Sequence, residues 1–149
     1  GVYKLAAIRN EAGGWDYKVK LSEQLIKVSN PGLIQVRRYF KDDQPVGDML
    51  YNQEQDVHTD RLMDPMEPGK SVPMPDYDRF QDLLVPVFRN GELVYDHPSI
   101  DEIRDHSCAQ LAQWPAEYLT LKDAAAYPVG LEEDLYNLKM SLIEKARSK

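Results

Sequence analysis

Residues 33–51 carry the clearest fold signal in the chain, and their sequence is LIQVRRYFKDDQPVGDMLY. Leu33 to Phe40 has the composition of a β-strand. Asp42-Asp43-Gln44-Pro45 ends that strand, because aspartate and proline favour turns, and Gly47 to Tyr51 forms a short further strand. Pro31-Gly32 predicts a tight bend just before the segment, since proline fixes φ and glycine permits the positive φ of a type II turn. The segment therefore predicts antiparallel β-structure.

A β-hairpin is predicted upstream of this segment. Val2 to Arg9 has the apolar content of a largely buried strand, and Asn10 to Gly14 supplies turn residues. From Trp15 to Leu21 apolar and polar residues alternate, which is the period-2 pattern of a strand with one face in a core. The N-terminal half therefore predicts antiparallel hairpins.

A second hairpin is predicted within residues 80–95. Asn90-Gly91 is the strongest short hairpin signal in the chain, because both residue types tolerate positive φ. The apolar residues on either side supply its two strands, Leu83 to Phe88 and Leu93 to Tyr95.

Helices are predicted after residue 99. Ser99 and Glu102 have the spacing of a capping box, in which each side chain bonds to the backbone amide of the other residue. The helix that follows runs to about Trp114, and Cys108 lies on its apolar stripe, so this cysteine is predicted to be a small core residue rather than a nucleophile. Three elements are predicted after it: a short helix at 116–121, an extended link at 127–130 and a last helix at 132–147, whose apolar stripe is Leu135, Leu138, Met140, Leu142 and Ile143.

The predicted fold class is therefore α+β, with antiparallel hairpins first and helices concentrated toward the C-terminus. Three segments follow from this pattern. Residues 1–51 form a basic, β-rich segment, and residues 77–149 combine a hairpin with helices. Residues 52–76 are interrupted by proline and glycine and contain many apolar residues, which favours a looped excursion over a solvated linker.

Composition excludes several classes of protein. The chain has 149 residues, of which 42% are hydrophobic and 29% charged, a balance typical of globular domains. No apolar run approaches the ~20 residues of a membrane-spanning helix, and the first residues lack a secretory signal pattern. A single cysteine excludes an internal disulfide framework and a cysteine-based zinc site, and favours a cytoplasmic setting.

The charge is distributed unevenly. The net charge is −7, but residues 1–41 hold eight Lys/Arg and three Asp/Glu, whereas the remaining residues hold ten and twenty-two. Such a basic segment on an acidic body either faces an anionic group or consists of solvated strand faces, and both readings stay open at this point. The acidic body argues against nucleic-acid binding by the chain as a whole.

A search for catalytic and metal-binding motifs finds none. His58, His97 and His106 are not spaced to bind one metal from a single helix or strand. Glycine-rich phosphate loops and a nucleophile elbow are absent from the sequence. The basic segment remains, where Lys20, Lys27, Lys4 and Arg9 surround a strand–turn–strand and indicate an anion such as phosphate nearby.

Several strings of residues, in order along the whole chain, resemble the nicotinate phosphoribosyltransferase family in the region after its barrel. The strings are Gly1-Val2-Tyr3-Lys4-Leu5-Ala6, Lys20-Leu21-Ser22, Lys27-Val28-Ser29-Asn30-Pro31-Gly32, Gly47-Asp48-Met49-Leu50, Leu83 to Gly91, Pro98 to Arg104, Tyr127-Pro128-Val129 and Leu138 to Ile143. The ordered series is more specific than any one string.

The resemblance implies an enzyme that joins nicotinate to phosphoribosyl pyrophosphate in NAD biosynthesis, coupled to ATP hydrolysis with Mg²⁺, as a cytoplasmic homodimer. It also implies that this chain is only the C-terminal portion. Residues 1–51 would complete a domain shared with upstream sequence, and the partners of this portion would be the barrel and the N-terminal domain. No catalytic residue and no cofactor then belongs to this chain alone, and it should be inactive in isolation.

Two residues are carried over from the resemblance. Lys20 and Lys27 match lysines near the phosphates of ATP or pyrophosphate. One departure concerns the turn after Pro31-Gly32, where the family has further basic residues and this chain has Leu33-Ile34-Gln35, which lowers the charge of the turn. The alternative hypothesis is a free-standing, non-enzymatic α+β module that uses its basic hairpin to bind an acidic partner or a nucleotide.

Overall fold

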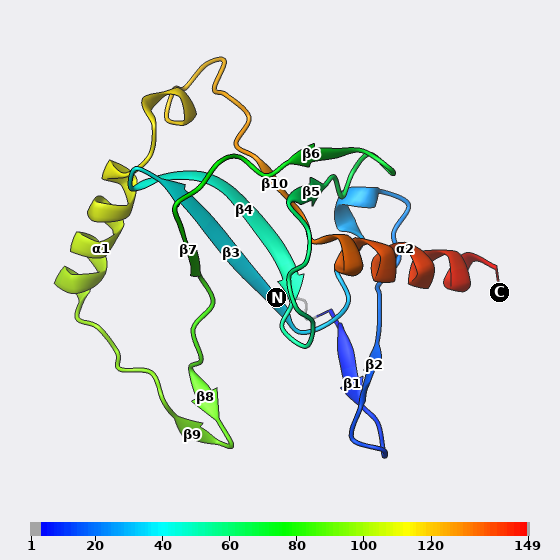
Figure 1. Ribbon diagram of the computed structural model, residues 1–149. Coiled ribbons are helices and arrows are strands. Elements are labelled where there is room, and N and C mark those ends of the chain that lie inside the picture. The colour runs from blue at the N-terminus through cyan, green and yellow to red at the C-terminus, as the bar shows by residue number, and fades with distance from the viewer. Residues whose placement is uncertain (1–3, 149) are drawn as a thin grey trace.

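A six-stranded mixed sheet forms the centre of the computed structural model, which describes residues 4–148 (Figure 1). Its strand order is β6-β5-β10-β4-β3-β7. The strands are β3 (Ile34–Lys41), β4 (Gln44–Asn52), β5 (Arg61–Met63), β6 (Ser71–Pro73), β7 (Arg79–Asp82) and β10 (Val129–Leu131). Every pair is antiparallel except β10 with β4, which is parallel. The predicted α+β class is confirmed.

The long hairpin of β3 and β4 supplies the two longest strands of the sheet. Its turn consists of Asp42 (φ 49°) and Asp43 (φ 61°), and aspartate tolerates this left-handed region better than most residues. The sequence placed Gln44 and Pro45 in the turn, but both already belong to β4. Because the turn has only two residues, Gln44 and Pro45 already pair with Lys41 and Phe40 of β3. The register shift between Tyr39 and Phe40 accommodates the proline.

Strand β10 was not predicted, because the pattern of residues 127–130 indicated an extended link. It inserts between β4 and β5, with Gly130 opposite Met49 and Leu131 opposite Leu50 and Met63. Three residues are too few to show a strand period, and their partners lie far away in the sequence. Leu131 is almost fully buried, so the link is part of the core.

The last helix, α2 (Glu133–Arg147), follows β10 directly. The Glu132 carboxylate accepts hydrogen bonds from the amides of Asp134 (2.8 Å) and Leu135 (3.2 Å), which satisfies two free donors at the helix start. The buried face of α2 consists of Leu135, Tyr136, Lys139 and Ile143. The predicted helix is confirmed, but its apolar stripe was only partly right, because a lysine occupies one of the buried positions.

Helix α1 (Ile100–Ala112) also forms where it was predicted, with both hydrogen bonds of the capping box present. It has no buried residue, and the side chain of Cys108 is exposed, so the prediction of a core cysteine is wrong. Figure 1 shows α1 within an arm, residues 83–128, that leaves the sheet after β7 and returns to it at β10. The capping box acts locally and specifies the helix without specifying what covers it.

The predicted hairpins are present but shorter than expected. The first consists of β1 (Ala7–Arg9) and β2 (Trp15–Tyr17), and Val2 and Tyr3 lie outside the described residues. The second consists of β8 (Phe88–Arg89) and β9 (Glu92–Leu93), joined by Asn90 and Gly91 with positive φ. Two 3₁₀ turns complete the structure, η1 (Leu25–Lys27) and η2 (Ala116–Tyr118), the latter in place of the short helix predicted at 116–121.

The core divides into two clusters on the sheet. Tyr39, Met49 and Leu62 form the first, and Leu131, Leu135 and Tyr136 form the second, against α2. Within the described residues, no helix has the length and apolar character needed to cross a membrane.

Replacement of Gly130 by alanine tests the insertion of β10. A Cβ at this position would lie 2.7 Å from the Leu62 Cβ and 2.9 Å from the backbone of Leu62 and Met63. We expect Gly130→Ala to lower the free energy of unfolding by roughly 2–3 kcal/mol, the cost of overpacking a core. Urea unfolding measures the change.

The matched control is Gly14→Ala, whose Cβ would approach only the flexible Asn10 side chain, at 3.4 Å. Equal stability of the two variants would show that β10 does not pack closely against β5.

Candidate functional site

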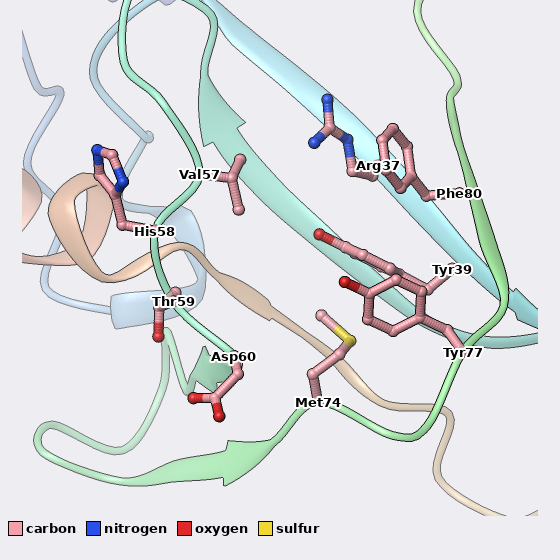
Figure 2. Close-up of a pocket in the computed structure, with 9 residues that line it drawn as sticks. All are labelled: Arg37, Tyr39, Val57, His58, Thr59, Asp60, Met74, Tyr77 and Phe80. Carbon is pink, nitrogen blue, oxygen red and sulfur yellow. The ribbon is translucent and has the colours of Figure 1, made fainter.

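A cleft of about 360 Å³ lies between the sheet and the loop that follows β4. Figure 2 shows Tyr39 from β3 and Tyr77 beside each other in this cleft, with Arg37 and Phe80 above them and Met74 below. The centroids of the two tyrosine rings are 4.7 Å apart in an edge-on arrangement. One wall of the cleft is therefore aromatic, whereas the loop opposite contributes polar side chains.

Arg37 is the main cation of the cleft, and it is held in place on several sides. Its Nε donates to Asp82 Oδ1 at 2.8 Å and its Nη2 to Asp82 Oδ2 at 3.1 Å and to the Tyr51 hydroxyl at 3.0 Å. The guanidinium carbon lies 4.2 Å from the Phe80 ring centre and 4.8 Å from that of Tyr51. The positive charge of Arg37 is thus balanced within the protein by the carboxylate of Asp82.

The same network shifts the pKa of its members. The hydrogen bond from Arg37 lowers the pKa of Asp82, while burial and the bond to Asp82 raise the pKa of Tyr51. Burial likewise raises the pKa of Tyr39. At neutral pH the tyrosines therefore keep their protons and Asp82 is ionised.

The cleft has no arrangement of groups for acid–base or nucleophilic chemistry. His58 and Asp60 come from the loop on its rim, and in Figure 2 both side chains point away from the tyrosine rings. A catalytic base needs to lie within hydrogen-bond reach of the proton it takes. The cleft can hold a ligand or a side chain, but its residues do not form a catalytic set.

A second ion pair fixes the return of the arm to the sheet. Arg38 binds both carboxylate oxygens of Asp48, at 2.9 and 2.8 Å, and the Tyr127 hydroxyl donates to the same carboxylate at 3.0 Å. Burial and the neighbouring Asp48 raise the pKa of Tyr127, so its hydroxyl stays a donor. Trp114 covers Arg38, with the guanidinium carbon 5.0 Å from the ring centre. This pair is structural, because Arg38 and the Tyr127 hydroxyl both direct their donors to the Asp48 carboxylate.

The two lysines predicted from the sequence, Lys20 and Lys27, lie in the connection between β2 and β3, with Lys27 at the end of η1. The Lys20 amide donates to the Ser29 hydroxyl at 2.8 Å, and the Lys27 carbonyl accepts from the Lys4 amino group at 2.8 Å. Both side chains are exposed. No carboxylate among residues 4–148 lies within 4.0 Å of either amino group. Their role in binding phosphate stays a prediction.

A third lysine was missed in the sequence. Lys139 on α2 is 4% exposed, and its amino group donates to Asn30 Oδ1 at 2.9 Å. Burial and the nearby charge of Lys4 lower its pKa. The spacing of Lys139, four residues after Leu135 and four before Ile143, puts it on the buried face of the helix, and this spacing was the available signal.

The described residues do not form a metal site, since no three His, Cys, Asp or Glu side chains in 4–148 gather closely enough to hold a cation.

Comparison with known proteins places these features in a family. The model of the nicotinate phosphoribosyltransferase C-terminal domain matches residues 35–139. The chain belongs to this family. A nicotinate phosphoribosyltransferase of Bacillus subtilis (strain 168) is 28% identical over 152 aligned positions, which cover 99% of this chain and 31% of that protein. The resemblance stated from the sequence is confirmed.

A solved structure agrees with this assignment. The crystal structure of human nicotinic acid phosphoribosyltransferase matches with a TM-score of 0.64 and 26% identity, over 87% of this chain and 27% of that one. The chain thus spans less than a third of the length of each of these two relatives.

The pKa shift of Asp82 predicts how acid affects stability. Because Arg37 holds the pKa of Asp82 below its ordinary value near 3.8, the pair stabilises the fold fully above about pH 4, and this contribution is lost as the pH falls through the lowered pKa. We expect Asp82→Asn to lower stability at neutral pH by about 1 kcal/mol, since the pair is partly exposed. The loss should disappear at the acid end of a pH series of urea unfolding curves.

Asp43→Asn is the control, because the Asp43 carboxylate is 86% exposed beside Arg79. It should change stability by less than about 0.5 kcal/mol at every pH. A pH-independent loss in Asp82→Asn would contradict the assignment.

Proposed function

We propose that this chain is the C-terminal portion of an enzyme that joins nicotinate to phosphoribosyl pyrophosphate, forming nicotinate mononucleotide and pyrophosphate for NAD biosynthesis. The observation that carries the proposal is the match along 99% of the chain to a nicotinate phosphoribosyltransferase. The structural match to the human enzyme supports it independently. In this proposal the chain is a scaffold rather than the catalytic centre.

The exposed apolar surface of the arm supports a scaffold role. Ile100 on α1 is 76% exposed, Phe88 on β8 is 65% exposed and Val85 is 58% exposed. A large amount of exposed apolar surface usually marks an interface. The upstream barrel and the N-terminal domain of the enzyme are the proposed partners, and a homodimer is the proposed assembly. This surface also favours the proposal over a free-standing module.

Two exposed lysines suggest which part of the substrates the chain would contact. Lys20 and Lys27 are exposed cations without a carboxylate partner in residues 4–148. Lysine is a compact point charge that suits phosphate groups. We place these two residues on the phosphate side of the site, near ATP or pyrophosphate. ATP would couple its hydrolysis to the reaction with Mg²⁺ held by residues upstream, in a cytoplasmic enzyme.

The isolated chain should not turn over nicotinate. Positioning and charge stabilisation of the reacting groups require residues that the cleft and the lysine loop do not supply. An assay of the 149-residue chain with nicotinate, phosphoribosyl pyrophosphate, ATP and Mg²⁺ should give no nicotinate mononucleotide, and the protein with its upstream sequence restored should form it. Turnover by the chain alone would contradict the scaffold role.

Replacement of Lys20 tests the phosphate side. In the protein with upstream sequence, we expect Lys20→Ala to reduce ATP-coupled turnover by about tenfold or more, because a charge-assisted hydrogen bond contributes about 1.5–3 kcal/mol. Lys27→Ala should act in the same direction. Steady-state kinetics with ATP as the varied substrate measures the effect.

Lys18→Ala is the matched control, because Lys18 is a nearby lysine whose amino group already lies 3.6 Å from the Asp16 carboxylate. It should retain nearly full turnover. Unchanged kinetics in Lys20→Ala would remove this residue from the phosphate site.

A further inference from the structure

A second cleft, of about 210 Å³, lies where η1, β10 and α2 meet, and Lys139 and its hydrogen-bond partner Asn30 both line it. We propose that this cleft is an interface that receives an aspartate or glutamate side chain from the upstream polypeptide of the enzyme, with the carboxylate paired to Lys139. The inference rests on the proposed function in one respect, namely that the chain is a portion of a longer polypeptide. The cleft shares no lining residue with the cleft beside Arg37.

The first argument concerns the unpaired charge of Lys139. A lysine that is 4% exposed is rare, because burial removes the water that stabilises its charge. Buried cations normally have an acidic partner, but no carboxylate of residues 4–148 lies within 4.0 Å of this amino group. The ammonium has three donors, and its hydrogen bond to Asn30 uses one. Two donors therefore remain for a carboxylate.

The second argument concerns the surrounding charge. Lys4 lies near enough for its positive charge to act on Lys139, and burial and this charge lower the pKa of Lys139. The Lys4 amino group donates to the Lys27 carbonyl at 2.8 Å, which is a neutral oxygen. A carboxylate beside Lys139 would offset both the lost hydration and the repulsion between the two lysines.

The third argument concerns the rim of the cleft, which favours a protein segment over a small ligand. Ile26 on η1 is 73% exposed, and Met66 and Val129 are exposed as well, although all three line the cleft. A ligand that fits within about 210 Å³ would leave much of this apolar rim in water. A polypeptide segment can cover the apolar rim and place one carboxylate in the cleft at the same time.

The fourth argument concerns which polypeptide supplies the carboxylate. Of the buried charged residues in 4–148, Asp48 pairs with Arg38 and Glu132 caps α2, whereas Lys139 contacts only the neutral amide of Asn30. The chain covers 31% of its Bacillus subtilis relative, so most of such an enzyme lies outside it. A segment of the same polypeptide reaches the cleft at a high effective concentration, which favours it over a second copy of this chain.

The first test measures the melting temperature of the protein with its upstream sequence after Lys139→Met, which keeps the length of the side chain and removes the charge. If a carboxylate pairs with Lys139, the variant leaves that carboxylate buried and unpaired, so the melting temperature should fall by at least about 3 °C. If Lys139 has no acidic partner, the variant removes an unpaired buried charge, and the melting temperature should stay the same or rise.

The matched control is Lys145→Met, which removes an exposed lysine from the same helix and should shift the melting temperature by less than about 1 °C. For Lys139→Met, a fall smaller than about 3 °C, no change or a rise would overturn the inference.

The second test is carbodiimide cross-linking of the same protein, followed by digestion and mass spectrometry. The reagent joins an amino group to a carboxylate in direct contact with it, as an amide, and takes up the water that is lost. Lys139 should be joined to an aspartate or glutamate of the upstream sequence. A cross-link from Lys139 to a carboxylate of residues 4–148, or no cross-link at Lys139, would overturn the inference.

Addition of nicotinate before the reagent separates a protein carboxylate from a substrate. The cross-link should stay, because the cleft is already filled, and a nicotinoyl group on Lys139 in its place would overturn the inference. Neither measurement uses turnover. Loss of both expected results in a protein that still forms nicotinate mononucleotide would therefore reject this interface alone, whereas both results in a protein without that activity would reject only the proposed reaction.

Discussion

The insertion of β10 between β4 and β5 is the constraint on which the structure depends. Three residues, Val129–Leu131, join a strand pair that would otherwise leave an unpaired edge in the middle of the sheet. The approach is so close at Gly130 that no side chain fits there. Because α2 begins directly after this strand, the same insertion directs Leu135 into the core and places Lys139 against Asn30. The cleft between η1 and α2 exists only when β10 is in place.

The parts of the fold that could be predicted are those with local causes. A two-residue turn of Asn90 and Gly91, and a capping box of Ser99 and Glu102, each depend on a few neighbouring residues, and both were confirmed. The burial of an element depends instead on what packs against it, which sequence patterns do not contain. Hence Cys108 was wrongly predicted to be in the core: the stripe of α1 is apolar, but no part of the described chain covers it.

Among the candidate sites too, some could be predicted from the sequence and others depend on packing between distant segments. Lys20 and Lys27 were found because they resemble a family pattern, and no carboxylate of residues 4–148 lies within 4.0 Å of either amino group. The aromatic cleft could not be found, because Tyr39 and Tyr77 belong to segments separated by three strands, β4, β5 and β6, and the loops between them. Lys139 could have been found from its spacing with Leu135, since a charged residue on a buried helix face needs a partner.

The cations of the chain fall into two groups that differ in what they leave available. Arg37 and Arg38 each bind a carboxylate through two nitrogens, so their charges hold strands and the arm together and cannot serve a ligand. Lys4 and Lys139 have only neutral oxygens as partners, which leaves their charge uncompensated within the described residues. Arginine suits the first task because its planar fork matches a carboxylate, and lysine suits the second because its ammonium can turn toward an arriving anion. In the N-terminal third, Lys4, Lys20 and Lys27 have no carboxylate of residues 4–148 within 4.0 Å, so their charge remains available for binding an anion.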